Sequence, residues 1–279
     1  MTRICSTEEV AAAVRAAREG ARAYCTNFFP SPDKLAGWIR RGALQGAVIG
    51  ETACFLQADR DFHHLYFCAP DLDRLVCTLT ALPEIRSERV VLDFVGQPAA
   101  VDAAMPALEH CGFRRYTRLI RMARVASVEI TPMVALPVSA AVSLAVPDDT
   151  ADILRLLEGT FNRYAEQLPT AEEVAKAVHA RQIMIVRDGV ELAGLLYYEA
   201  QGVSAVIRYW LVASSFRGRG VGSALMHACL ATNQRIRRFV LWVLVGNTGA
   251  IARYRHYAFV PDGLTDDVWV NERIAGCAI

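Results

Sequence analysis

The stretch that decides the fold is Arg217-Gly218-Arg219-Gly220-Val221-Gly222-Ser223, which joins an apolar strand pattern to a helical pattern. Its alternating glycines let the backbone approach a ligand closely. The first amides of the following helix point toward a common anion, and Arg217 and Arg219 add charges that suit phosphate oxygens. The segment therefore predicts a binding site for a phosphate or a pyrophosphate.

Two other kinds of phosphate loop fit this sequence poorly. The chain contains no G-x-x-x-x-G-K-[ST] motif. A dinucleotide-binding loop would lie early in a βαβ unit, with an acidic residue about 20 positions further on. Here the turn follows several strand patterns instead, because residues 183–186 and 192–198 form a predicted hairpin across Asp188-Gly189 and residues 203–212 continue the sheet.

Strand and helix patterns alternate along the whole C-terminal half, which favours an α/β or α+β domain over a bundle or a sandwich. The other expected elements are a helix from Asp148 or Asp149 through Leu157, a helix opened by Thr170 and Glu173 at capping-box spacing, a helix over 221–231, a strand over 239–245, a helix over 247–257 and a strand over 268–270.

The N-terminal half repeats the end of this pattern. Residues 91–97 resemble residues 240–247, and residues 109–113 resemble residues 255–259. A spacing of roughly 150 residues is long for a solenoid repeat, so the pattern predicts a duplicated domain. The expected division is a first domain over 1–126, a linker over 127–140 and a second domain over 141–279.

The first domain is expected to lack a phosphate loop. No glycine occurs between Gly50 and Gly96, and the chain reads Cys68-Ala69-Pro70-Asp71-Leu72-Asp73-Arg74 where the turn would follow a strand. The two acidic residues oppose an anion, and the proline removes an amide donor. We therefore expect one cofactor per chain, with the first domain supporting or covering the acceptor site.

Two segments of the second domain resemble the GNAT superfamily of N-acetyltransferases, over about residues 140–279. The pattern Arg-x-x-Gly-x-Gly at 217–222 is similar to that family's coenzyme A pyrophosphate loop. Residues 241–259 are similar to its later strand and helix, although Ala258 replaces the family's closing glycine. The resemblance implies two GNAT-like domains, each with a mixed, mostly antiparallel sheet flanked by helices.

The resemblance also implies an activity, an N-acetyltransferase that moves an acetyl group from acetyl-CoA to a primary amine of a small molecule or a peptide. Tyr254 corresponds to the family tyrosine that acts as a general acid beside the sulfur. The implied cofactor-binding residues are Leu211, Val212, Arg217, Gly218, Arg219, Gly220, Val221, Gly222, Ser223, Asn247, Ala250 and Tyr254.

The general base is left open at this stage. Many relatives carry a glutamate on the strand before the glycine turn, whereas residues 205–210 contain no carboxylate. Glu199 acting through water and Tyr209 are two alternatives. Residues 160–167 correspond to the family's acceptor-lining segment. Glu166 within it, or Glu158 just before it, would attract a cationic amine, and a surface charge is the alternative for each.

Composition limits the partners and the compartment. Thirty Lys and Arg residues against 29 Asp and Glu residues leave a formal net charge of +1, so no nucleic-acid partner is expected. No two cysteines form a C-x-x-C pair, and His63 and His64 point to opposite faces of a strand, so no metal site is expected. The sequence contains no apolar run long enough to span a membrane, so a cytoplasmic protein is expected. A monomer or a homodimer is expected as well.

Two other functions stay open. The missing strand carboxylate is consistent with a coenzyme A-binding sensor that transfers nothing. A tRNA-dependent aminoacyltransferase of the tandem-GNAT kind is the second alternative, and the glycine turn and the neutral charge argue against it.

Overall fold

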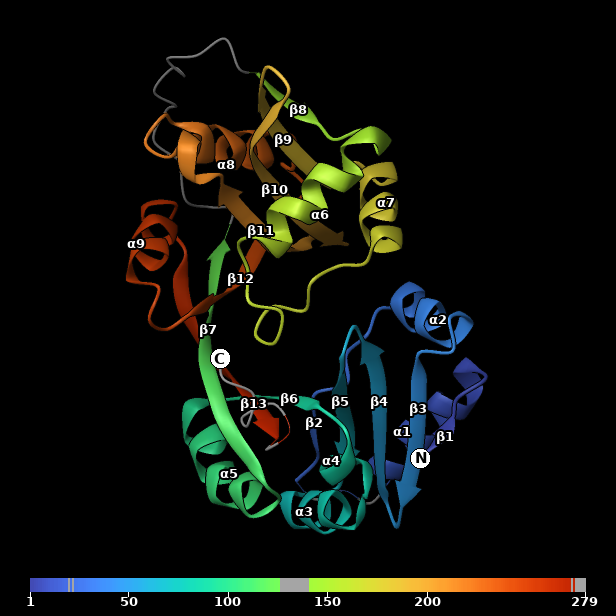
Figure 1. Ribbon diagram of the computed structural model, residues 1–279. Coiled ribbons are helices and arrows are strands. Elements are labelled where there is room, and N and C mark those ends of the chain that lie inside the picture. The colour runs from blue at the N-terminus through green and yellow to red at the C-terminus, as the bar shows by residue number, and fades with distance from the viewer. Residues whose placement is uncertain (20, 22, 126–140, 272, 274–279) are drawn as a thin grey trace. The chain divides into compact units, whose positions relative to one another are not determined.

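The computed structural model describes residues 1–19, 21, 23–125, 141–271 and 273 (Figure 1). The chain divides into two compact units, one of Met1–Leu119 together with the residues from Gly263 onward, and one of Ile120–Asp262. The expected linker over 127–140 lies outside the described residues.

The N-terminal unit is a mixed sheet with helices on both faces (Figure 1). Its elements are β1 (Thr2–Arg3), α1 (Thr7–Arg18), β2 (Cys25–Thr26), α2 (Pro32–Arg40), β3 (Leu44–Ile49), β4 (Thr52–Asp59), β5 (Phe62–Ala69), α3 (Leu72–Ala81), α4 (Glu84–Ser87), β6 (Val90–Gly96), α5 (Pro98–His110), the first part of β7 (Phe113–Val125) and the second part of β13 (Val260–Asn271). The strands follow the order β1-β3-β4-β5-β6-β13-β7, in which β5 and β6 are parallel. Helices α1 and α2 cover one face, and α3 and α5 cover the other.

The C-terminal unit has the same plan. Its elements are the end of β7, β8 (Val142–Leu144), a 3-10 turn (Pro147–Asp149), α6 (Thr150–Glu158), α7 (Ala171–His179), β9 (Ile183–Asp188), β10 (Glu191–Gln201), β11 (Ser204–Val212), a 3-10 turn (Ser214–Phe216), α8 (Val221–Thr232), β12 (Arg238–Leu244), α9 (Thr248–His256) and the start of β13. The strands follow the order β7-β12-β11-β10-β9-β8, and β11 and β12 are the parallel pair. Helices α6 and α7 lie on one face of the sheet, and α8 and α9 lie on the other. Two units of GNAT-like α/β architecture are thus present, as expected.

The units exchange their last strands, which the expected ranges 1–126 and 141–279 did not include. Ile120 and Met122 of β7 join the core of the C-terminal unit. The end of β13 pairs with β6 instead, and its Trp269 is fully buried opposite Leu92. Asn271 then fixes that end, because its Oδ1 accepts the Val90 N–H at 3.1 Å. A large apolar ring buried this completely anchors the strand to the unit that contains it.

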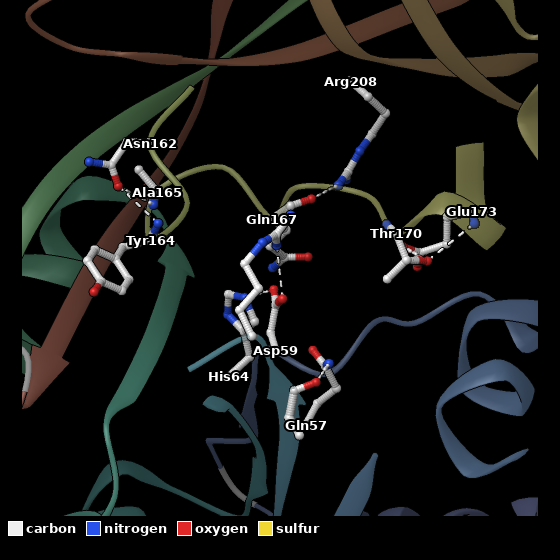
Figure 2. A network of polar contacts seen from close by, with 12 residues as sticks. Gln57, Asp59, His64, Asn162, Tyr164, Ala165, Gln167, Thr170, Glu173 and Arg208 are labelled. Atoms are coloured by element: carbon white, nitrogen blue, oxygen red, sulfur yellow. Dashed lines mark hydrogen bonds and ion pairs between the residues drawn. The ribbon is translucent and has the colours of Figure 1, made fainter. Parts of the chain in front are cut away.

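Local sequence signals set the helix starts near the site. At α7, Glu173 donates its N–H to Thr170 Oγ1 at 3.3 Å, and Thr170 returns its N–H to Glu173 Oε2 at 2.8 Å (Figure 2). This is the predicted capping box. Asp149 precedes α6 as expected, but its side chain does not cap the helix. Its carboxylate instead accepts the Val146 N–H and forms an ion pair with Arg187.

Candidate active site

The site is organised around a bulge in β11. Tyr197 on β10 lies opposite Tyr209, but the next residue, Tyr198, lies opposite Ile207, so Arg208 has no partner residue. A bulge of this kind reverses the alternation of side chains along a strand. Ile207 accordingly packs on the face covered by α8, whereas Tyr209 packs on the face covered by α6 and α7.

Beyond the bulge, β11 and β12 diverge. Their parallel pairing runs from Ser204 with Arg238 to Ile207 with Leu241 and ends there, although both strands continue, to Val212 and Leu244. The last residues of β11 therefore bond β10 on one edge and receive no partner from β12 on the other. Unpaired backbone groups at such an edge are available to an extended ligand.

The alternation of the strand shows which of these groups are available. Ala213 donates its N–H to Ala193 O at 2.9 Å, toward β10. Because successive residues direct their backbone groups to opposite edges, Val212 and Trp210 face the side of β12, and Leu211 faces β10. Of the two expected backbone contacts, Val212 lies on the free edge and Leu211 does not.

The glycine turn leads directly into α8. Gly218 and Gly220 adopt left-handed φ values of +78° and +79°, and Gly220 is the N-cap of the helix. No side chain caps this helix, and among the described residues the N–H groups of Val221, Gly222 and Ser223 have no acceptor. Such free amides at a positive helix end form an anion site.

Gly222 lies in the close contact between this first turn and β11. A Cβ at Gly222 would lie 3.3 Å from Val212 Cγ2 and 3.5 Å from Trp210 Nε1. Trp210 also donates its indole N–H to Gly222 O at 3.0 Å. The free edge of β11 and the free amides of α8 therefore belong to one continuous surface.

Arg217 and Arg219 are both exposed beside this turn. The Arg219 guanidinium lies over the Phe216 ring at 5.2 Å, and Arg217 Nε lies 3.5 Å from Val212 O. Neither forms an ion pair with a carboxylate in the described part of the chain, so both charges are available to an anion.

Helix α9 carries the second predicted motif. Asn247 caps the helix, and its Oδ1 accepts the Ala250 N–H at 3.1 Å. Tyr254, one and a half turns inside, packs its ring against Trp210 of β11. Asn247, Ala250 and Tyr254 therefore lie on the helix whose aromatic face meets β11 near its free edge.

Tyr254 retains its proton at neutral pH. Burial raises the pKa of its hydroxyl to about 12; the Arg253 charge lowers this pKa, and the Glu166 charge raises it. Within the described residues the hydroxyl has no hydrogen-bond partner. A neutral phenol without an internal acceptor is suited to donate its proton to a developing anion.

Glu166 was expected from the sequence to attract a cationic amine or to be a surface charge, and it was not among the candidate bases. Its Oε2 accepts the Asn162 N–H at 2.8 Å, which closes a tight turn, and Oε1 accepts no hydrogen bond from the described residues. Burial raises the pKa of this carboxyl to about 7. A sequence motif could not reveal this pKa, because it depends on how the turn is packed.

The segment that carries Glu166 is attached to β11 at two points. The Phe161 ring lies 5.2 Å from the Tyr209 ring, and Tyr209 donates its hydroxyl to Gln167 O at 2.8 Å. Arg208, the bulged residue, approaches the same carbonyl at 3.5 Å (Figure 2). The bulge therefore positions the predicted acceptor segment as well as the diverging strand.

The two alternative bases are less well suited. Burial raises the pKa of Tyr209 to about 12, and its hydroxyl already donates to Gln167 O. Glu199 is exposed; it accepts the Tyr197 hydroxyl at 3.2 Å and lies 3.8 Å from Arg208 Nε. Tyr209 is therefore committed as a donor, and Glu199 is engaged by Tyr197 and lies beside Arg208, so neither is as well placed to accept a proton as Glu166.

Comparisons with known proteins agree with this geometry. Residues 150–259 match the Acetyltransferase (GNAT) family. A solved tandem GNAT protein from the clavulanic acid biosynthesis pathway is 15% identical, with a TM-score of 0.59 over 96% of this chain and 97% of that one. A GCN5-related N-acetyltransferase from Sphaerobacter thermophilus is 16% identical, with a TM-score of 0.57 over 94% of this chain and 91% of that one. A comparison with curated protein sequences found no match.

Residues 150–259 thus form a domain of the GNAT acetyltransferase family, and the chain as a whole has a tandem GNAT fold. This fold supports acyl transfer in general. Among the described residues, no cluster of side chains could hold a metal ion. None of the described helices combines the length and the apolar character that crossing a membrane requires.

Proposed function

We propose that the chain is an N-acetyltransferase that moves an acetyl group from acetyl-CoA to a primary amine of a small molecule or a peptide. The observation that carries this proposal is the proximity of two sets of backbone N–H groups that have no acceptor among the described residues, the Val212 N–H on the edge of β11 and the first turn of α8. One set suits an extended arm with amides, and the other suits a pyrophosphate.

The residues fit coenzyme A as follows. The N–H groups of Val221, Gly222 and Ser223 would bind the pyrophosphate, with Arg217 and Arg219 beside it. The free edge of β11 would pair with the pantetheine arm. When bound, acetyl-CoA supplies an acetyl thioester, which an amine attacks. The Val212 N–H is placed to stabilise the negative charge that develops on the carbonyl oxygen.

Two side chains move the protons. An alkylammonium with an ordinary pKa of about 10.4 must lose a proton before it attacks. Glu166 takes this proton, directly or through one water, because its Oε1 accepts no hydrogen bond from the described residues and its raised pKa lies near neutral pH. Tyr254 gives a proton to the departing thiolate. The carboxylate also draws a cationic acceptor toward the segment 160–167.

The first test measures acetyl-CoA binding by calorimetry in Gly222→Glu. The side chain would collide with Val212 and Trp210 and place an anion at the phosphate site, so affinity should fall by about 100-fold or more. Ala231→Glu adds the same charge at the exposed far end of the same helix and should bind normally. Unchanged affinity in folded Gly222→Glu contradicts the coenzyme A assignment.

The second test separates the remaining functions. Wild-type protein is incubated with labelled acetyl-CoA and a panel of small-molecule and peptide amines. Transfer to an amine supports the proposal. Tight binding without transfer to any amine would favour a sensor, and binding of tRNA in place of coenzyme A would favour an aminoacyltransferase.

A further inference from the structure

The N-terminal unit contains the same strand divergence as the C-terminal one. Strands β5 and β6 are parallel and pair at three positions, from His63 with Val90 to Leu65 with Leu92. Both then continue without further pairing to each other, β5 to Ala69 and β6 to Gly96. Helix α3 follows β5 just as α8 follows β11. The framework that offers free backbone groups in the C-terminal unit is therefore present twice.

In the N-terminal unit, one side chain fills this divergence. Asn27 is buried, with 7% of its surface exposed. Its Nδ2 donates to Leu65 O on β5 at 3.0 Å and to Asp93 O on β6 at 2.8 Å. Its Oδ1 accepts the Phe67 N–H at 2.7 Å. The carboxamide thus bridges both strands and uses both of its donor hydrogens and its acceptor.

The neighbours of Asn27 hold it in this position. Thr26 pairs with Cys68 in an antiparallel bridge, and its hydroxyl donates to Phe67 O at 2.6 Å. On the other side, the Phe28 ring stacks on Phe55 at 4.7 Å. The segment is therefore a third strand-like element in the divergence, and it is built into the fold.

The corresponding segment of the C-terminal unit behaves differently. It also connects the first two helices, α6 and α7, but it contacts β11 through the Phe161 ring and the Gln167 carbonyl, on the face that those helices cover. Among the described residues, no side-chain amide joins the backbones of β11 and β12. The divergence of the C-terminal unit is left to a ligand.

The N-terminus of α3, which corresponds to the proposed phosphate site at the N-terminus of α8, is also occupied by a side chain. Asp71 is the N-cap of α3, and its Oδ1 accepts the Arg74 N–H at 2.8 Å. Asp73 adds a second acid in the first turn. A carboxylate therefore occupies the place where Gly220 leaves α8 open, and negative charge at this helix end opposes a phosphate.

We propose that the Asn27 carboxamide is an internal ligand that occupies, in the N-terminal unit, the position that a pantetheine amide takes between β11 and β12. This inference rests on the proposed coenzyme A site of the C-terminal unit. The chain then binds one coenzyme A, and the bridge between β5 and β6 is permanent. The pantetheine arm and Asn27 present the same chemistry to the strands, an amide with N–H donors and a carbonyl acceptor.

Hydrogen exchange resolved at single amides tests the bridge without any ligand. The Phe67 N–H should exchange slowly in the wild-type protein, and Asn27→Ala should speed its exchange by about tenfold or more relative to the other β5 amides. Asn27→Asp should have a similar effect, because its carboxylate oxygen would face the Leu65 and Asp93 carbonyls. Unchanged protection of Phe67 in a folded variant would overturn the inference.

Coenzyme A binding supplies the second measurement. Calorimetry should give one site per chain, and this site should disappear in Gly222→Glu. Added coenzyme A should protect the Val212 N–H and leave Phe67 unaffected. Two sites per chain would overturn the inference about Asn27. A single site that survives Gly222→Glu would instead contradict the proposed coenzyme A site at α8. Absence of any binding would overturn the proposed function instead, while the Phe67 measurement would still decide the bridge.

Discussion

The rings of Tyr254 and Trp210 lie with their centroids 5.6 Å apart, so the proposed proton donor on α9 is packed against the strand that diverges from β12. Tyr254→Phe keeps this packing and removes only the hydroxyl. We expect kcat to fall by about 100-fold, with little change in the KM for acetyl-CoA. Steady-state kinetics with an amine that the acceptor panel identifies checks this.

Tyr257→Phe is the matched control for that variant. Tyr257 lies next to α9 and its ring is also 5.6 Å from Trp210, but no role in catalysis is assigned to it. Its kinetics should equal those of the wild-type protein. A Tyr254→Phe enzyme with full kcat would remove Tyr254 from the mechanism.

Glu166 makes a prediction about the pH dependence of the rate. The carboxyl accepts a proton only when it is ionised, and its pKa is raised to about 7. In the wild-type enzyme, kcat/KM should therefore rise with pH up to about 7. This rise lies at lower pH than the further rise that deprotonation of the amine substrate causes. In Glu166→Gln, the rise that ends near pH 7 should be absent, and kcat/KM should be lower than in the wild-type enzyme by about 100-fold. Glu172→Gln, at a partly exposed position of α7 where the carboxylate pairs with Lys176, should keep the wild-type profile. A retained limb in Glu166→Gln would exclude Glu166 as the base.

The same raised pKa predicts a change in stability with pH. The folded state binds a proton at Glu166 more tightly than the unfolded state, whose ordinary pKa is 4.5. Between pH 4.5 and about 7, the folded protein therefore loses stability as the carboxyl ionises. Glu166→Gln should be as stable as wild type at pH 4 and more stable at pH 8, as measured by urea unfolding at both values. A constant difference between the two proteins would mean that Glu166 titrates normally.

Arg217 and Arg219 should each contribute to coenzyme A affinity. A charge-assisted hydrogen bond to a phosphate contributes about 1.5–3 kcal/mol, so Arg217→Ala or Arg219→Ala should weaken binding by about tenfold or more. The difference from wild type should shrink at high salt. Arg235→Ala, also exposed on the same unit, is the control and should bind normally. Equal affinity of all three variants would place the phosphates elsewhere.

The sequence predicted those parts of the site that depend on local geometry. The glycine turn before α8 and the helix that begins near Asn247 require particular residue types within a few positions, so their pattern is visible in one segment. The bulge at Arg208 and the pKa of Glu166 depend on pairing and burial far along the chain. Asn27 is a single residue without a motif, and only its three hydrogen bonds to β5 and β6 identify it.

The exchange of the last strands was not predicted for a similar reason. The sequence shows an apolar strand around 268–270, and this strand is present as the end of β13. Its partner is β6, about 170 residues earlier in the chain, and apolar alternation does not specify which sheet edge a strand joins. The location of Trp269 in the N-terminal core decides this pairing.

Ala258 supplies a prediction about stability alone. It follows α9 with a left-handed φ of +60°, at the position where the family has glycine. The geometry is imposed by the helix end, because Phe259 donates its N–H to Tyr254 O at 3.0 Å. Alanine in the left-handed conformation costs the folded state about 1–2 kcal/mol, and glycine removes this cost. Glycine also increases the conformational entropy of the unfolded state, which offsets part of the stabilisation. Ala258→Gly should therefore raise the free energy of unfolding by up to about 1 kcal/mol. Ala252→Gly, at an exposed position inside the same helix, should lower it by about 1 kcal/mol. Urea unfolding of both variants compares the two effects, and a loss of stability in Ala258→Gly would show that the left-handed alanine is not strained.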